Sequence, residues 1–585
     1  MVNHGGIPTF LNVLKRFTEL EPKLSAREAT IGDTAIPGFR HFLGGADGTL
    51  QAKDRFKPFG EDPTFEQESQ RKLRNLMGRL AHRMSVPYAS DDGDNNNIPA
   101  GYTYLLQLIA HDLVQSSVSA SILDDVFAGA RNHRQARLRL DTIYGAGPDS
   151  NALFYACGGE ASVRNALRMG RMAHDPSAGC PFRDIPRFSP GDQTGESAEG
   201  YADALIADTR NDNHAILSQT TTLFHLLHNG IVAKLLPQAA QLVQAGSETE
   251  ATLNNFFCAR AAVTMIYRSV IRNDVMQRIL HPKVYRIYKD EFESSRLLER
   301  TDDRMPLEFS HAAFRFAHSM IRHRYKVNAG SSGGIGSALE ATSLRSPLRM
   351  PLSRNWIIDW SNFFVINGSA PNLSQRIRPK YTPALLNPEL FPIIEDTSQP
   401  GLACRDLVSS VELGLWSVDR LIERLGVNSG SGISEAISKC VNGSRLLMDK
   451  DLRRCLLAKW LADHAGSHTL SDPNDISALA LEPPLMFFIQ YEAWAGESDD
   501  GGELKGASLG ILGSIIVADV IFAALADRGQ WESRDIGASL ANLNARFFGN
   551  NWDAFSKIPN LANMSDVIEF IGNLHGLKNA EPKFS

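Results

Sequence analysis

The chain has 585 residues, of which 43% are hydrophobic and 22% charged, as in an ordinary globular protein. Its formal net charge of −6 gives no electrostatic basis for binding nucleic acid or an anionic membrane. The six cysteines are scattered and form no CxxC pair, which argues against a zinc or redox motif.

The sequence predicts a cytoplasmic protein. Its N-terminus, MVNHGGIPTFLNVLKRF, lacks a charged region followed by an apolar one, so no signal peptide is expected. The most apolar stretch, residues 507–526, carries Asp519 and two glycines, and we expect a buried core helix there rather than a membrane span. The oligomeric state is left open.

Apolar residues at helical spacing predict long helices in four segments, 98–119, 208–236, 252–272 and 309–325. Three or four more helices are expected between residue 401 and about residue 545. Residues 120–200 are predicted to be a long irregular segment that is functional or covers a ligand, rather than a linker, and residues 346–392 to be connecting structure. The expected fold class is therefore mainly α, with very little β structure. We expect one large domain, 96–545, with an N-terminal arm, 1–95, and a C-terminal tail, 546–585.

The first predicted helix places Gln107 and His111 on one face, with Asp112 turned about 100° away. A histidine in a pocket can take a proton from peroxide and return it to the departing oxygen, because its pKa lies near neutrality. By itself, such a histidine is more often a packed core or surface residue.

Two further segments carry candidate residues. In ADTRNDNHAIL (207–217), Asp208 or Thr209 can cap a helix whose first turn holds Arg210, and an arginine can stabilise charge on a leaving oxygen. In FSHAAFRFAHSMIRHRY (309–325), His318 lies within an apolar stripe, which is how a proximal haem ligand is presented. Each residue alone has a plainer interpretation, a surface salt bridge for Arg210 and simple packing for His318.

Taken together, the three segments resemble the animal haem peroxidase superfamily, the peroxidase–cyclooxygenase group, and particularly its bacterial members. The family's distal motif is matched by IPAGYTYLLQLIAHD (98–112), its DxRND motif by DTRND (208–212), and its proximal motif by FRFAHSM (314–320). Weaker similarity extends the resemblance over about residues 95–545, in the family's order.

The resemblance implies that Gln107 and His111 are the distal pair, Arg210 the distal arginine and His318 the proximal iron ligand. Asp406 matches the position whose side chain accepts a hydrogen bond from the proximal imidazole, an asparagine in many relatives. A carboxylate there would make the imidazole a stronger donor to iron. The plainer alternative is that Asp406 only pairs with a cation such as Arg405.

Several positions depart from the family's pattern. Mammalian members esterify their haem through an aspartate and a glutamate, where this chain has Ala110 and Asn213, so we expect haem b held without covalent bonds. Asp112 matches a calcium ligand, but Arg139 replaces a loop carboxylate. Since a guanidinium repels Ca²⁺, and Arg139 could instead pair with Asp112, bound calcium is disfavoured.

Arg315 lies on the proximal side with the cofactor-binding residues His318 and Asp406, three residues before His318. Oxygenase relatives carry a radical-forming tyrosine at that position. The implied function is therefore a haem peroxidase that reduces hydrogen peroxide and oxidises a small organic or halide donor through a high-valent iron–oxo intermediate. The alternatives are a fatty-acid or natural-product oxygenase of the same superfamily and a non-catalytic haem-binding protein.

Overall fold

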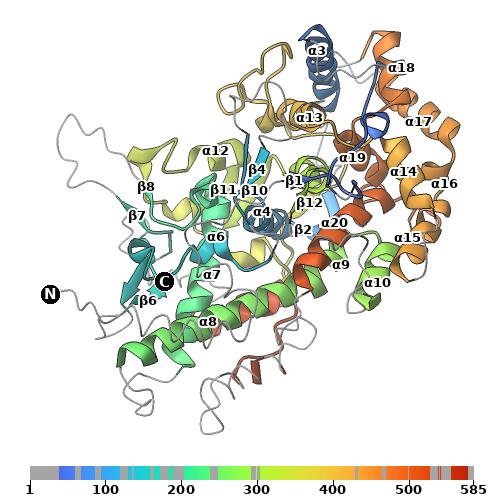
Figure 1. Cartoon of the computed structure of the whole chain (residues 1–585). Coiled ribbons are helices and arrows are strands. Elements are labelled where there is room, and N and C mark those ends of the chain that lie inside the picture. The colour runs from blue at the N-terminus through green and yellow to red at the C-terminus, as the bar shows by residue number, and fades with distance from the viewer. Residues whose placement is uncertain are drawn as a thin grey trace.

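We analysed a computed structural model of the chain. It describes residues 39–577 apart from 46, 60–66, 86–93, 119–129, 135–136, 158–163, 172–182, 189–202, 237–247, 292–297, 299–303, 428–431, 464–469, 499, 527–537, 539, 542–554 and 556. Helices dominate these residues, and the strands form two-stranded ribbons only, which confirms a mainly α fold with little β structure (Figure 1).

Helix α4 (Gly101–Leu113) lies near the centre of the molecule and carries the first predicted site residues (Figure 1). It is shorter than the sequence predicted, because strand β2 (Asp94–Pro99) precedes it and strand β3 (Ser116–Val118) follows it. Gly101 begins the helix where a Cβ would lie 2.3 Å from the ring of Phe364, so only glycine allows this close approach.

The segment 208–236 folds as a short 3₁₀ turn followed by helix α7 (Ala215–Lys234). Asp208 caps the 3₁₀ turn by accepting a hydrogen bond from the N–H of Arg210, one of the two caps expected. His214 caps α7, and its Nδ1 accepts from the N–H of Leu217 at 3.1 Å. These two caps hold the chain between Asp208 and His214 against the N-terminal end of α7.

The segment 309–325, expected to be one helix, is broken. Helix α11 (Leu307–His311) ends at Ala312, whose φ of −133° is not helical. The 3₁₀ helix η7 (Ala313–Met320) follows and carries His318, and residues 324–328 form strand β10. Both α4 and η7 pack against other helices of the core and against each other.

The C-terminal half contains more helices than expected. Between residues 402 and 525 the described chain forms eight, α13 to α20, where the sequence indicated three or four. Their bounds are Leu402–Glu412, Val418–Gly426, Ile433–Asn442, Arg445–Met448, Lys450–Ala462, Pro473–Leu481, Leu485–Ala495 and Ile511–Leu525. Several are shorter than three turns, and apolar periodicity is weak over so few residues.

Helix α20 is the buried core helix predicted for residues 507–526. The carboxylate of Glu492 on α19 accepts hydrogen bonds from the N–H groups of Leu512 and Gly513 at 2.8 and 3.2 Å, which satisfies the start of α20. Asp519, the charged residue within it, accepts from the hydroxyl of Tyr288 at 3.0 Å. No helix among the described residues has both the length and the apolar character needed to cross a membrane.

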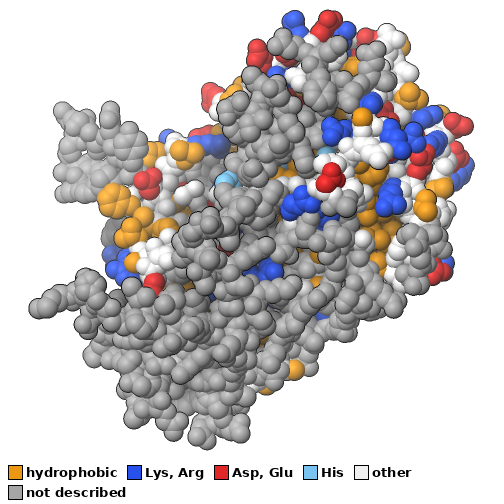
Figure 2. Space-filling model, viewed as in Figure 1, with side chains coloured by type: hydrophobic (Ala, Val, Ile, Leu, Met, Phe, Trp, Pro, Cys, Tyr) orange, Lys and Arg blue, Asp and Glu red, His pale blue; other side chains and the backbone are white. Residues whose placement is uncertain are grey.

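Both terminal regions contact the main body where they are described. Helix α3 (Gln67–Met84) packs against α13, with an ion pair between Arg74 and Glu412, and strand β1 (Phe39–Arg40) pairs with β9 (Met305–Pro306). Helix α22 (Met564–His575) packs on α7. On the face drawn in Figure 2, acidic and basic side chains are interspersed over the described surface.

Candidate active site

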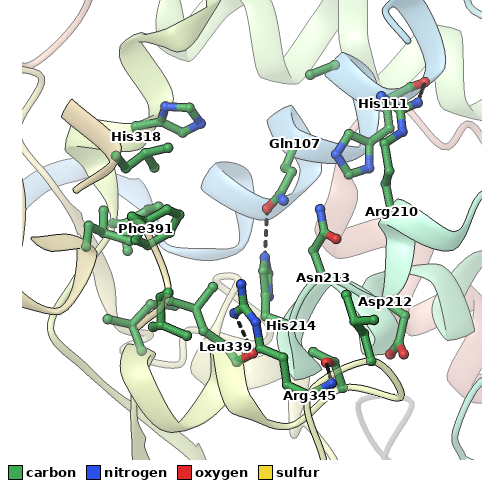
Figure 3. A pocket seen from close by; sticks show the side chains of 18 of the residues that line it. Gln107, His111, Arg210, Asp212, Asn213, His214, His318, Leu339, Arg345 and Phe391 are labelled. Atoms are coloured by element: carbon green, nitrogen blue, oxygen red, sulfur yellow. Dashed lines mark hydrogen bonds between the residues drawn. The ribbon is translucent and has the colours of Figure 1, made fainter. Parts of the chain in front are cut away.

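A cavity of about 720 Å³ opens between α4, the start of α7 and η7. His318 lies on one side of it, and Gln107 and His111 lie on the other (Figure 3). Arg210 also lines the cavity, so all four residues that the motifs predicted as distal or proximal lie on one site. Much of the remaining wall is apolar, and it includes Leu106, Phe314, Ile335, Leu339, Leu385, Leu390 and Phe391.

The ring of His318 is oriented by a buried carboxylate. Its Nδ1 lies 2.6 Å from Oδ2 of Asp406, while one third of the side chain remains exposed to the cavity. Burial opposes the charge of Asp406, but His318 and Arg315 outweigh it and hold the pKa of this carboxyl below its usual value. Since Asp406 is ionised, Nδ1 of His318 is the donor, and Nε2 presents its lone pair to the cavity.

Asp406 does more than pair with a neighbouring cation. Its Oδ1 accepts from Arg315 at 2.5 Å, and its Oδ2 also accepts from the hydroxyl of Tyr381 at 3.1 Å. Tyr381 in turn accepts from the amide of Gln490 at 3.1 Å. The partner of Asp406 among the arginines is Arg315, whereas its sequence neighbour Arg405 faces the cavity.

If haem binds here as the resemblance implies, replacing Asp406 with Asn is expected to raise the reduction potential of its iron and to slow its reaction with peroxide about 10–100-fold, the usual cost of losing an outer-shell partner. An amide accepts less strongly than a carboxylate, so the His318 imidazole becomes a weaker donor to a metal. Spectroelectrochemistry and stopped-flow absorbance measure the two effects. Tyr381→Phe is the matched control, because it removes one donor and keeps the His318 contact. A potential unchanged in Asp406→Asn would contradict the assignment.

His111 is held in one tautomer by Asn211. The amide of Asn211 donates to the carbonyl and hydroxyl of Thr142, at 3.2 and 3.0 Å, so its Oδ1 must accept. That oxygen lies 2.9 Å from Nδ1 of His111, which is therefore the protonated nitrogen. Nε2 has no partner among the described residues and is left as a base facing the cavity.

Burial, and then the positive charge of Arg210, lower the pKa of His111 to about 4. The neutral ring is the form that can accept a proton, and it predominates above that pH. If the site reacts with peroxide as the resemblance implies, the rate of that first reaction should be flat above about pH 5 and fall as the pH drops below about 4. Stopped-flow measurements from pH 3.5 to 8 check this, and a rate that already halves near the ordinary histidine pKa of 6.5 would contradict it.

A second histidine, which the motif analysis did not single out, orients Gln107. Because Nδ1 of His214 accepts from the backbone, its Nε2 carries the hydrogen and donates to Oε1 of Gln107 at 2.8 Å (Figure 3). Burial lowers the pKa of His214 to about 3, so this ring stays neutral. The amide N–H groups of Gln107 are consequently available to the cavity as donors.

Arg210 is more constrained than the sequence suggested. Its Nε and Nη2 bind Asp208, and its Nη1 and Nη2 donate to the carbonyls of Val114 and His111 at 2.6 and 2.9 Å. These bonds use four of its five N–H groups and tie the C-terminal end of α4 to the 3₁₀ turn. Arg210 therefore places a positive charge beside His111 and holds the C-terminal end of α4. At most one of its N–H groups is left to donate to a ligand.

The structure also describes the surroundings of the residues that bear on covalent haem attachment and on calcium binding. Ala110 and Asn213 line the cavity, and neither side chain can form an ester. Asp112 accepts from the N–H groups of Leu140 and Thr142, at 2.9 and 3.4 Å. The haem type and the disfavoured calcium remain predictions.

Comparison with known proteins agrees with this site. Residues 158–368 match the family model of the animal haem peroxidases, a range that includes Arg210 and His318. Over this range the chain is similar to the animal haem peroxidases. No curated protein matches the sequence.

Two solved structures of fatty acid alpha-dioxygenases share the fold of this chain. The Oryza sativa enzyme is 12% identical, with a TM-score of 0.50 over 97% of this chain and 91% of its own. The Arabidopsis thaliana enzyme is 11% identical, with a TM-score of 0.51 over 100% of this chain and 90% of its own. At such low identity the likeness concerns the fold alone.

The cavity suits the haem that this family implies. Nε2 of His318 faces the cavity with its opposite nitrogen fixed on Asp406, so this residue would hold the iron of a bound haem. The opposite wall offers a base, Nε2 of His111, whose other nitrogen is held by the neutral amide of Asn211, together with the amide donors of Gln107. A planar apolar macrocycle fits between the two walls, and the apolar side chains that line the cavity would contact its faces.

Proposed function

We propose that this protein is a haem-dependent peroxidase that reduces hydrogen peroxide and oxidises small organic or halide donors. The observation that carries the proposal is the neutral His111, whose unprotonated Nε2 faces the same cavity as His318. When bound, haem supplies an iron centre that binds peroxide and takes up its oxidising equivalents.

The distal residues supply the proton movements. Nε2 of His111 accepts the proton of peroxide and later returns it to the departing oxygen, while the Nδ1–H bond to Asn211 keeps the ring in place. The N–H groups of Gln107 and the positive charge of Arg210 stabilise negative charge that develops on that oxygen. On the opposite wall, Asp406 holds His318 and strengthens it as a donor.

The position of Arg315 supports a peroxidase over an oxygenase. By the resemblance, oxygenase relatives have a radical tyrosine there, whereas this side chain is ion-paired to Asp406. The test is to give the purified protein hydrogen peroxide with a phenolic donor, and separately an unsaturated fatty acid with an oxygen electrode. We expect peroxide-dependent phenol oxidation and no oxygen uptake. Rapid oxygen uptake with little phenol oxidation favours an oxygenase, and neither activity favours a non-catalytic haem protein.

A further inference from the structure

Most arginines near the site are committed to carboxylates of the protein itself. Arg210 binds Asp208 and Arg315 binds Asp406. Arg187, which precedes the 3₁₀ turn in the sequence, binds both Asp184 and Asp212. Each of these three guanidinium groups therefore already has a carboxylate partner within the protein.

Two arginines that line the cavity have no such pair. Arg345 and Arg405 are both exposed and both contribute to the cavity wall, which places them at its opening. No carboxylate among the described residues forms an ion pair with either of them. The guanidinium of Arg345 donates to the carbonyl of Leu339 at 2.9 Å and lies beside His214 (Figure 3). Arg405 extends from α13, next to the residue that holds the proximal histidine.

The two side chains therefore approach the opening from different sides, Arg345 from the distal wall and Arg405 from the proximal helix. Behind them the wall is largely apolar, with Leu339, Leu390 and Phe391 among its residues. An amphiphilic ligand with a carboxylate edge and an apolar body matches this arrangement, because guanidinium groups bind carboxylates with paired hydrogen bonds.

We propose that Arg345 and Arg405 form a carboxylate-binding pair that receives the two propionate groups of haem, with the apolar edge of the macrocycle facing inward. The proposal rests on the haem-binding part of the function proposed above and not on peroxide turnover. The same chemistry could receive the carboxylate of an organic acid substrate, so the experiment separates the two sources.

The experiment measures haem loss to excess apomyoglobin from protein loaded with haem or with haem dimethyl ester, which lacks free carboxylates. We expect the wild-type protein to lose haem more slowly than it loses haem dimethyl ester. Arg345→Gln and Arg405→Gln should each speed haem loss about three- to ten-fold, as expected for losing a charged hydrogen bond at a partly exposed site. Neither variant should change the loss of the ester.

Matched controls isolate the charge at the opening. Arg349→Gln removes an exposed arginine four residues from Arg345 that does not line the cavity, and it should retain haem as the wild type does. Asp203→Asn removes an exposed carboxylate from the cavity wall and should not speed haem loss. Arg345→Lys keeps the positive charge and should retain haem nearly as well as the wild type. That result would show that the faster haem loss of Arg345→Gln is not caused by misfolding.

Two results would overturn the proposal. One is equal acceleration of haem and ester loss in the glutamine variants, which would mean that the arginines act through packing. The other is unchanged haem loss together with weaker binding of decanoate, measured by its effect on the Soret band, which would assign the pair to a substrate acid. Because neither readout involves peroxide, failure of the peroxidase function would leave this test intact.

Discussion

Replacing His318 with Ala is expected to abolish the Soret band of the purified protein, or to shift it to the spectrum of a different ligand. Nε2 of His318 is the imidazole nitrogen that faces the cavity on the proximal side, and its opposite nitrogen is fixed on Asp406. Without this donor the iron would lose its protein ligand on the proximal side, and haem would be held more weakly or by another ligand. Absorbance spectra and a pyridine haemochrome assay measure the loss.

The surroundings of His318 make this variant interpretable. Asp406 keeps Arg315 and Tyr381 as partners when the imidazole is removed, so no unpaired buried charge is created. Added imidazole should partly restore the spectrum by occupying the space left by the ring. His323→Ala is the matched control, since His323 is exposed five residues further along and does not line the cavity. A normal Soret band in His318→Ala would overturn the ligand assignment.

The sequence predicted the existence of the helices better than their limits. Apolar spacing located α4, α7, α8 (Glu248–Val270) and α20, because each buries much of its surface over several turns. It could not show the break at Ala312, because apolar residues keep the helical spacing of three to four residues on both sides of the break. The short helices after residue 402 were undercounted for the related reason that each spans too few turns.

The candidate site was predicted from three short motifs and not from spacing. Gln107, His111, Arg210 and His318 meet on one cavity, although 211 residues of chain separate Gln107 from His318. The residues that orient them were missed, because their contacts join distant positions. Asn211 lies within the DTRND motif and could have been singled out, but its hold on His111 depends on Thr142, 69 residues away.

His214 and Arg345 illustrate what sequence reasoning could not reach. A histidine three residues after the DTRND motif's asparagine has no distinguishing pattern, and its role emerges only from the 2.8 Å contact with Gln107. Arg345 is one of many arginines in the chain. It is a candidate because no carboxylate among the described residues pairs with it, and that is a property of the fold.

His111→Ala is expected to slow the first reaction with hydrogen peroxide by about 10²–10⁴-fold, the usual contribution of a positioned acid–base group. The fold should survive, because the main interaction lost is the hydrogen bond to Asn211, whose amide keeps its bonds to Thr142. Stopped-flow absorbance under single-turnover conditions measures the rate directly.

Two further features distinguish loss of a base from general damage at the site. The decline in rate below about pH 4, which reflects protonation of His111, should vanish in His111→Ala, and added imidazole should restore part of the rate. Asn211→Ala should show a smaller loss and keep the acid decline, because it leaves the base in place but frees its ring. If His111→Ala reacted with peroxide as fast as the wild type, the distal base would have to be another group, and the proposed peroxidase mechanism would lose its central step.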